Sequence, residues 1–75
     1  MNNENRLSEA RQALNTEKCN ETYFLSQLEL ALREKKYRAL SEYANKLESC
    51  KSQQDWLEVE IRSIETDIEF EAREI

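Results

Sequence analysis

The side chains best suited to chemistry in this sequence are two cysteines, Cys19 and Cys50, because the chain of 75 residues contains no histidine. Without imidazole groups the chain lacks a partner that would activate a thiolate, a proton relay near neutral pH and the histidine ligands of many zinc sites. We therefore expect no catalytic residues, no metal and no other cofactor. We interpret both thiols as small apolar side chains on helix faces, with a disulfide as the alternative.

Carboxylates are the other chemically capable groups, with sixteen Asp and Glu in a chain that is 36% charged. A pair of carboxylates can act as general acid and base, but closely spaced glutamates on a helix usually form a solvated face. The chain is thus predicted not to be an enzyme and to act on no small-molecule substrate.

Glycine and proline are both absent, although average usage would supply roughly nine of them. Tight hairpin turns, phosphate-binding loops and nucleophile elbows all depend on these residues. Their absence predicts an all-α protein whose elements position side chains for recognition.

The length of the chain limits it to one helical domain over residues 1–75. A core of this size rarely supplies more than roughly 3 to 5 kcal/mol, so a second subunit would help considerably. No apolar run is long enough to span a membrane, and the start at Met1 lacks the basic and apolar regions of a signal peptide. These features predict a cytoplasmic protein.

The strongest periodicity lies in the C-terminal half, where apolar residues follow the four and three spacing of a coiled coil. These residues are Leu57, Ile61, Ile64, Ile68 and Ile75. Traced backward, the same spacing would allow one helix from about 40 to 75 and meets Gln54, Cys50, Leu47, Tyr43 and Leu40. However, Ser52 followed by Asp55 resembles a capping box, which would begin a new helix before Trp56.

The distribution of charge favours an antiparallel hairpin with its turn near Lys51. Residues 33–38 form a basic block, whereas residues 55–75 hold eight acidic and two basic side chains. Folding the chain near Lys51 brings the basic block opposite Glu65, Asp67 and Glu69, whereas a parallel dimer of one long helix would place the block against itself. Two straight helices in a swapped antiparallel dimer would make the same contacts, and this alternative stays open.

A second polar stretch at residues 15–22 predicts a break there, because two asparagines and two threonines interrupt good helix formers. The sequence then gives helices at about 3–15, 21–50 and 53–75, an antiparallel helical hairpin (coiled coil) with a short N-terminal helix. The expected hairpin face of the middle helix comprises Leu25, Leu28, Leu32, Leu40, Tyr43 and Leu47. In this arrangement the two cysteines lie far apart, and no disulfide should form within one chain.

A second apolar edge runs beside the expected hairpin face. Its members on the middle helix, at seven-residue spacing, are Tyr23, Leu30, Tyr37 and Ala44; those on the last helix are Trp56, Val59 and Phe70. Tyrosine and tryptophan are enriched as interface anchors, so we take these seven as candidate partner-binding residues. The first helix, a second copy of the chain or an amphipathic helix of another protein would each cover this edge.

The segment Gln27-Leu28-Glu29-Leu30-Ala31-Leu32, followed by a basic stretch, resembles the first long helix of the small co-chaperones of type III secretion. The later Leu47-Glu48-Ser49 and the overall size are also similar. The sequence departs from that family by having no glycine between its long helices and a longer acidic tail. The resemblance implies a helical chaperone without catalytic residues, which with a larger partner keeps a needle subunit soluble.

Together these features predict a non-enzymatic helical protein-binding module, most concretely a small cytoplasmic chaperone or adaptor for another helical protein such as a secretion-system subunit. The alternative is an acidic inhibitor that imitates nucleic acid and occupies a nucleic-acid-binding protein, with the acidic tail as its contact surface. A third possibility is a structural homo-oligomeric coiled coil. The basic block is short and the net charge is −5, which argues against binding nucleic acid directly.

Overall fold

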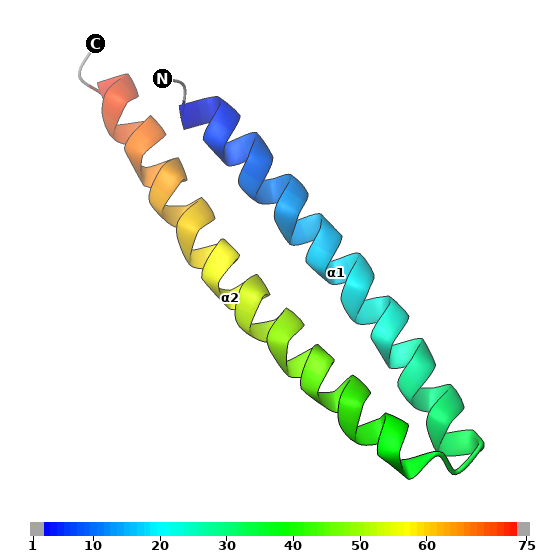
Figure 1. The fold of residues 1–75 in the computed structure, drawn as a ribbon. Coiled ribbons are helices and arrows are strands. Elements are labelled where there is room, and N and C mark those ends of the chain that lie inside the picture. The colour runs from blue at the N-terminus through cyan, green and yellow to red at the C-terminus, as the bar shows by residue number, and fades with distance from the viewer. Residues whose placement is uncertain (1–2, 74–75) are drawn as a thin grey trace.

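Two long helices joined by a tight turn form the whole of the described structure, a computed structural model that describes residues 3–73 (Figure 1). Helix α1 spans Asn3–Arg33 and helix α2 spans Tyr37–Arg73. The helices run antiparallel along a rod of 61 × 15 × 14 Å, and both described ends lie at the end remote from the turn. The prediction of an all-α antiparallel helical hairpin is confirmed.

The two helices meet along a seam in which inward-facing positions alternate in spacings of three and four residues, as in a coiled coil. On α1 the seam comprises Asn3, Leu7, Ala10, Leu14, Glu17, Glu21, Phe24, Leu28 and Ala31. On α2 it comprises Leu40, Tyr43, Leu47, Cys50, Gln54, Leu57, Ile61, Ile64 and Ile68. Ile64 is the most deeply buried of these, with 1% of its surface exposed.

Neither predicted break exists, so the predicted helices 3–15, 21–50 and 53–75 are wrong. Helix α1 continues through residues 15–22, where the hydroxyls of Thr16 and Thr22 donate to the carbonyls four residues earlier, each at 3.1 Å. Threonines in such bonds satisfy their polar groups inside a helix instead of ending it. Helix α2 continues past Ser52, and Lys51 Nζ pairs with Asp55 Oδ1 at 2.7 Å across the supposed cap.

The turn lies at residues 34–36, inside the basic block, and closes α1 without glycine. The Lys36 N–H donates to the Ala31 carbonyl at 2.8 Å, and the Lys35 N–H donates to the Leu32 carbonyl at 3.2 Å. Lys35 adopts φ 59°. This is the pattern of a Schellman motif, whose left-handed position is usually occupied by glycine. A lysine there carries the steric penalty of its Cβ atom.

This turn replaces the predicted pairing of the helices. The basic block does not face Glu65, Asp67 and Glu69, because it forms the tip of the hairpin at the opposite end of the rod. Glu65 Oε2 instead pairs with the Arg11 guanidinium at 3.1 Å. Of the predicted hairpin face, Leu28, Leu40, Tyr43 and Leu47 lie in the seam, whereas Leu25 and Leu32 are 47% and 58% exposed.

The phase of the seam explains why the chain turns here. Continued past Ala31, the α1 spacing would reach positions 35, 38 and 42, whereas the α2 spacing begins at Leu40 and Tyr43. That offset of two residues rotates one stripe by about 160° relative to the other, at about 100° per residue. A single straight helix would therefore carry the two stripes on opposite sides and could not offer both to one antiparallel partner. The hairpin is the arrangement that buries both.

A polar layer interrupts the apolar seam near the middle of the rod. It contains Glu17 and Glu21 from α1, which are half-buried, and Cys50 and Gln54 from α2, which are buried. Gln54 is 8% exposed, and within residues 3–73 its Nε2 atom has no hydrogen-bond partner. An unpaired buried donor lowers stability, but a polar residue in a coiled-coil seam also specifies register.

Replacing Lys35 by glycine should stabilise the protein, because glycine adopts the left-handed conformation without a steric penalty. We expect Lys35→Gly to raise the free energy of unfolding by about 1 kcal/mol relative to Lys35→Ala, which removes the same charge but keeps the Cβ atom. Urea denaturation followed by circular dichroism measures this difference. Equal stabilities for the two variants would contradict the left-handed turn.

Replacing Gln54 by leucine should also stabilise the hairpin, because it removes an unsatisfied buried donor and adds apolar surface to the seam. We expect a gain of about 1 to 2 kcal/mol in the free energy of unfolding. The matched control is Gln53→Leu, because Gln53 is the exposed neighbour and should change stability by less than about 0.5 kcal/mol. A loss of stability in Gln54→Leu would show that the amide is satisfied in solution.

Candidate protein-binding site

Within residues 3–73, no three or more histidine, cysteine, aspartate or glutamate side chains are placed to hold a metal ion. Over the same residues, neither helix has an apolar stretch long enough to cross a membrane. The two thiols and the exposed apolar side chains are candidates for a functional site.

The two thiols lie on different helices and in different environments. Cys19 is exposed on α1, Cys50 is buried in the polar layer of the seam, and both are free. Burial raises the pKa of the Cys50 thiol, and a hydrogen bond with Glu17 together with the negative charges of Glu17 and Glu21 raises it further. The predicted helix over residues 21–50, which would hold the two cysteines far apart, does not form, because the turn at residues 34–36 places Cys19 on α1 and Cys50 on α2.

Exposed apolar side chains concentrate around the turn. Eight large hydrophobic side chains are exposed among the described residues, and five of them lie between positions 23 and 37. With the exposed Ala44 they form what we name the apolar tip surface: Tyr23, Leu25, Leu30, Leu32, Tyr37 and Ala44. Tyr37 is 65% exposed and Leu32 is 58% exposed, although both are large enough to anchor an interface.

The turn divides the predicted seven-residue edge between the two helices. Tyr23 and Leu30 lie on α1, and Tyr37 and Ala44 lie on α2. The ion pair of Arg11 with Glu65 marks one flank of the seam. On α1, Leu25 and Leu32 lie 14 and 21 residues after Arg11. On α2, Tyr37 and Ala44 lie 28 and 21 residues before Glu65. The seven-residue repeat therefore puts all four on that flank: Leu25, Leu32, Tyr37 and Ala44.

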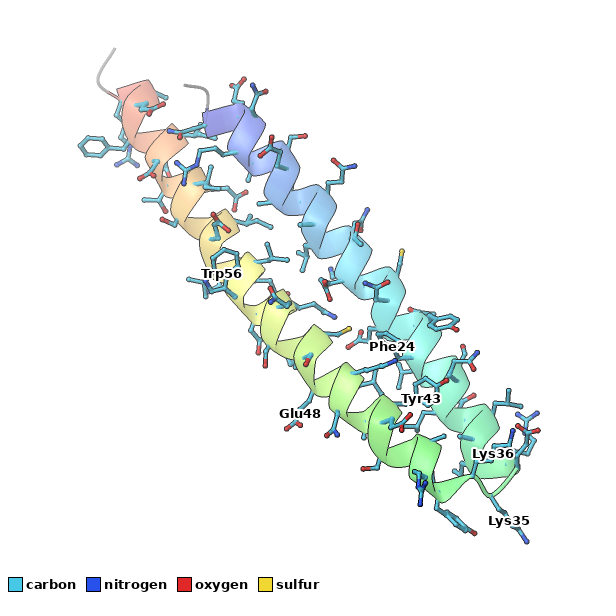
Figure 2. The ribbon with its side chains drawn as sticks, in the orientation of Figure 1. Phe24, Lys35, Lys36, Tyr43, Glu48 and Trp56 are labelled. Carbon is cyan, nitrogen blue, oxygen red and sulfur yellow. The ribbon has the colours of Figure 1, made fainter. Side chains whose placement is uncertain are left out.

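Tyr23 and Leu30 lie on the other flank, beside an aromatic cluster that the sequence did not indicate. The Phe24 ring lies 5.6 Å from the Tyr23 ring, edge to face, and 6.3 Å from the Tyr43 ring across the seam (Figure 2). Lys46 Nζ lies 5.5 Å from the centre of the Phe24 ring and 5.7 Å from that of Tyr43. Such contacts hold aromatic rings in fixed orientations. A hollow of about 230 Å³, lined in part by Leu30 and Tyr43, adjoins the cluster.

The remaining predicted residues, Trp56, Val59 and Phe70, are not brought to the tip surface. They are 60%, 62% and 62% exposed and lie on α2 in the half of the rod remote from the turn. Figure 2 shows Trp56 well separated along the rod from Phe24 and Tyr43. The structure therefore places the seven predicted residues in two regions, four near the turn and three away from it.

Charged side chains are also distributed unevenly along the rod. The turn carries four exposed basic side chains within six residues: Arg33, Lys35, Lys36 and Arg38. Lys36 Nζ lies 3.6 Å from a carboxylate oxygen of Glu34. Residues 52–73 of α2 hold seven acidic and two basic side chains. Residues 23–44, which include the apolar tip surface, hold four basic and three acidic side chains, whereas the remote apolar residues lie in a segment with a large acidic excess.

Comparison with protein-family models, with curated proteins and with solved structures gave no match to this chain.

The two thiols should react at very different rates, because one is exposed and the other is buried with a raised pKa. With 5,5′-dithiobis(2-nitrobenzoic acid) at pH 8, we expect one thiol per chain to react at least tenfold faster than the other. In Cys19→Ser only the slow reaction should remain, and in denaturant both thiols should react rapidly. A fast reaction of Cys50 in folded Cys19→Ser would contradict its place in the seam.

Proposed function

We propose that this protein is a non-enzymatic helical protein-binding module that holds another helical protein against the apolar tip surface. The observation that carries the proposal is the clustering of exposed large side chains around the turn, Tyr23, Leu25, Leu30, Leu32 and Tyr37. Scattered single apolar residues are normal on a protein surface, whereas several large ones concentrated near one end of a rod suggest an interaction site.

Physical properties of the tip surface support this role. Burial of exposed apolar area contributes roughly 25 cal/mol per Å², so several large side chains covered together can hold a partner. Two tyrosines supply amphipathic anchors, and Tyr23 packs against Phe24, which limits the freedom it would lose on binding. A rod only two helices thick leaves a partner helix room to lie beside the seam, as in helix-in-groove recognition.

The concrete form of the proposal is a small cytoplasmic chaperone or adaptor for a helical partner, such as a secretion-system subunit. The segment that resembles the type III secretion co-chaperones, residues 27–32, forms the last turns of α1 and supplies Leu30 and Leu32 to the tip surface. A chaperone that shields an apolar helix needs exposed apolar side chains of this kind and no reactive group.

The alternative, an acidic inhibitor that imitates nucleic acid, is favoured by the seven acidic side chains in residues 52–73. A phosphate mimic needs carboxylates that are free to meet a basic protein. Glu65 pairs with Arg11, Glu69 pairs with Arg73, and Glu71 accepts a hydrogen bond from Asn3 at 2.7 Å. Exposed pairs of this kind are weak, so the two functions are distinguished by experiment.

Partner capture should depend on the apolar tip surface. The tagged protein is purified from its own host, and the proteins that accompany it are quantified by mass spectrometry. We expect the triple variant Tyr23→Ser, Leu30→Ser, Tyr37→Ser to lose its principal helical partner at least tenfold. Capture by the unmodified protein should persist at 0.5 M salt, because apolar burial is not screened.

The chain offers a matched control in Trp56→Ser, Val59→Ser, Phe70→Ser, which removes similar side chains from the half remote from the turn. This control should keep the partner, and circular dichroism should show that both variants are folded. If capture survives the tip changes but is lost in Glu65→Gln, Asp67→Gln, Glu71→Gln or at high salt, the acidic-inhibitor function replaces the one proposed.

A further inference from the structure

We infer that a second copy of the chain covers one flank of the apolar tip surface when the partner is absent, in an antiparallel pair that lays the basic tip of each hairpin against the acidic half of the other. This inference rests on the proposed function in that it assigns an occupant to the same surface. It is carried by the separation of charge along the rod and by the distribution of exposed apolar side chains.

The basic residues of the tip and the acidic half of α2 lie in different parts of the rod. The basic residues Arg33, Lys35, Lys36 and Arg38 form the tip, and the acidic side chains of α2 extend to the far end of a 61 Å rod. Exposed charges separated by more than about 10 Å are largely screened at 0.1 M salt, so the two ends do not stabilise each other inside a hairpin. Between chains, the same charges can come into contact.

An antiparallel pair contains two contacts in which a basic tip meets an acidic half. With two hairpins side by side and their turns at opposite ends, each basic tip lies beside residues 52–73 of the other copy, where acidic side chains outnumber basic ones by seven to two. Hairpins aligned with their turns together would place four basic residues of one tip beside four of the other. A twofold axis makes the two antiparallel contacts identical and closes the assembly at two copies.

The exposed apolar residues fit the same alignment. The remote group Trp56, Val59 and Phe70 lies within the acidic half of α2. An antiparallel copy brings its apolar tip surface to that half, so apolar side chains of one chain are offered to those of the other. A side-by-side contact uses one face of each hairpin, so it covers the exposed apolar side chains on that face and pairs the two regions of opposite charge.

Charge reversal in two sets of residues tests the inference. The tip-reversed variant is Lys35→Glu, Lys36→Glu, Arg38→Glu, and the tail-reversed variant is Glu58→Lys, Glu60→Lys, Asp67→Lys. The tail set leaves Glu65 and Glu69 in place, because these pair with Arg11 and Arg73. Sedimentation velocity and native mass spectrometry of the full chain are recorded at 50 mM and 500 mM salt.

The unmodified chain should sediment with twice its 9.0 kDa mass at 50 mM salt, and its dissociation constant should rise at least tenfold at 500 mM. Each reversed variant alone should be monomeric, because both of its contacts join like charges. An equimolar mixture of the two should form heterodimers, in which both contacts join opposite charges. Circular dichroism should show unchanged helicity for each variant, and glutamine replaces glutamate or lysine in any variant that loses it.

A monomeric unmodified chain, a dimer that persists in either reversed variant, or a mixture that stays monomeric would overturn the inference. The proposed function is read separately, by partner capture with the tail-reversed variant, whose apolar tip surface is intact. If that variant is monomeric and still captures the partner, both statements stand. If it captures no partner and the rescued heterodimer still forms, the proposed function fails while the dimer is retained.

Discussion

The two-residue offset between the seam of α1 and the seam of α2 is the constraint on which the rest of the structure depends. Each stripe alone would suit a long straight coiled coil, but in one continuous helix they would lie about 160° apart. Only a reversal of direction lets them bury each other. The chain therefore turns between Ala31 and Leu40, although its turn residues are good helix formers and none of them is glycine.

The position of that turn determines which side chains are left exposed. Placed at residues 34–36, it moves Leu25 and Leu32 out of the core and distributes Tyr23, Leu30, Tyr37 and Ala44 over two helices. A turn near Lys51 would have buried the leucines and kept the tyrosines on one edge. The same reversal puts four basic residues at the tip and leaves the acidic half of α2 toward the other end of the 61 Å rod, which creates a charge separation that a single hairpin does not neutralise.

The fold class and much of the seam could be predicted from the sequence, but the position of the turn could not. The isoleucine spacing from Leu57 to Ile68 predicted the α2 seam, and tracing it backward reached Cys50 and Gln54, which are indeed buried. The α1 seam was harder to recognise, because Glu17 and Glu21 occupy two of its positions and make the stripe look interrupted. Ser52 and Asp55 imitated a cap because local polar patterns do not reveal whether a helix continues through them.

The candidate binding residues show the same limit. All seven candidate residues are exposed in the structure, both the four selected by seven-residue spacing and the three that stand off the isoleucine stripe. Their spacing did not indicate that the turn separates them into two regions, or that Phe24, which contacts Tyr23 on α1, is itself held by Tyr43 and Lys46 across the seam. Such contacts follow from the register of the two helices. That register depends on the two-residue offset between the seams, which the polar residues in the seam and the apparent cap made hard to recognise in the sequence.

The aromatic cluster beside the turn has a consequence for how the chain folds. Phe24 and Tyr43, which are in contact, are only 19 positions apart in the sequence, whereas Arg11 and Glu65 are 54 positions apart. The entropy lost on closing a loop grows with its length, so contacts near the turn form at the smallest conformational cost and those near the termini join later. Pairing should begin at the tip and extend toward the termini across the polar layer. The part of the molecule that presents Tyr23, Leu30 and Tyr37 is therefore the part that acquires its structure first.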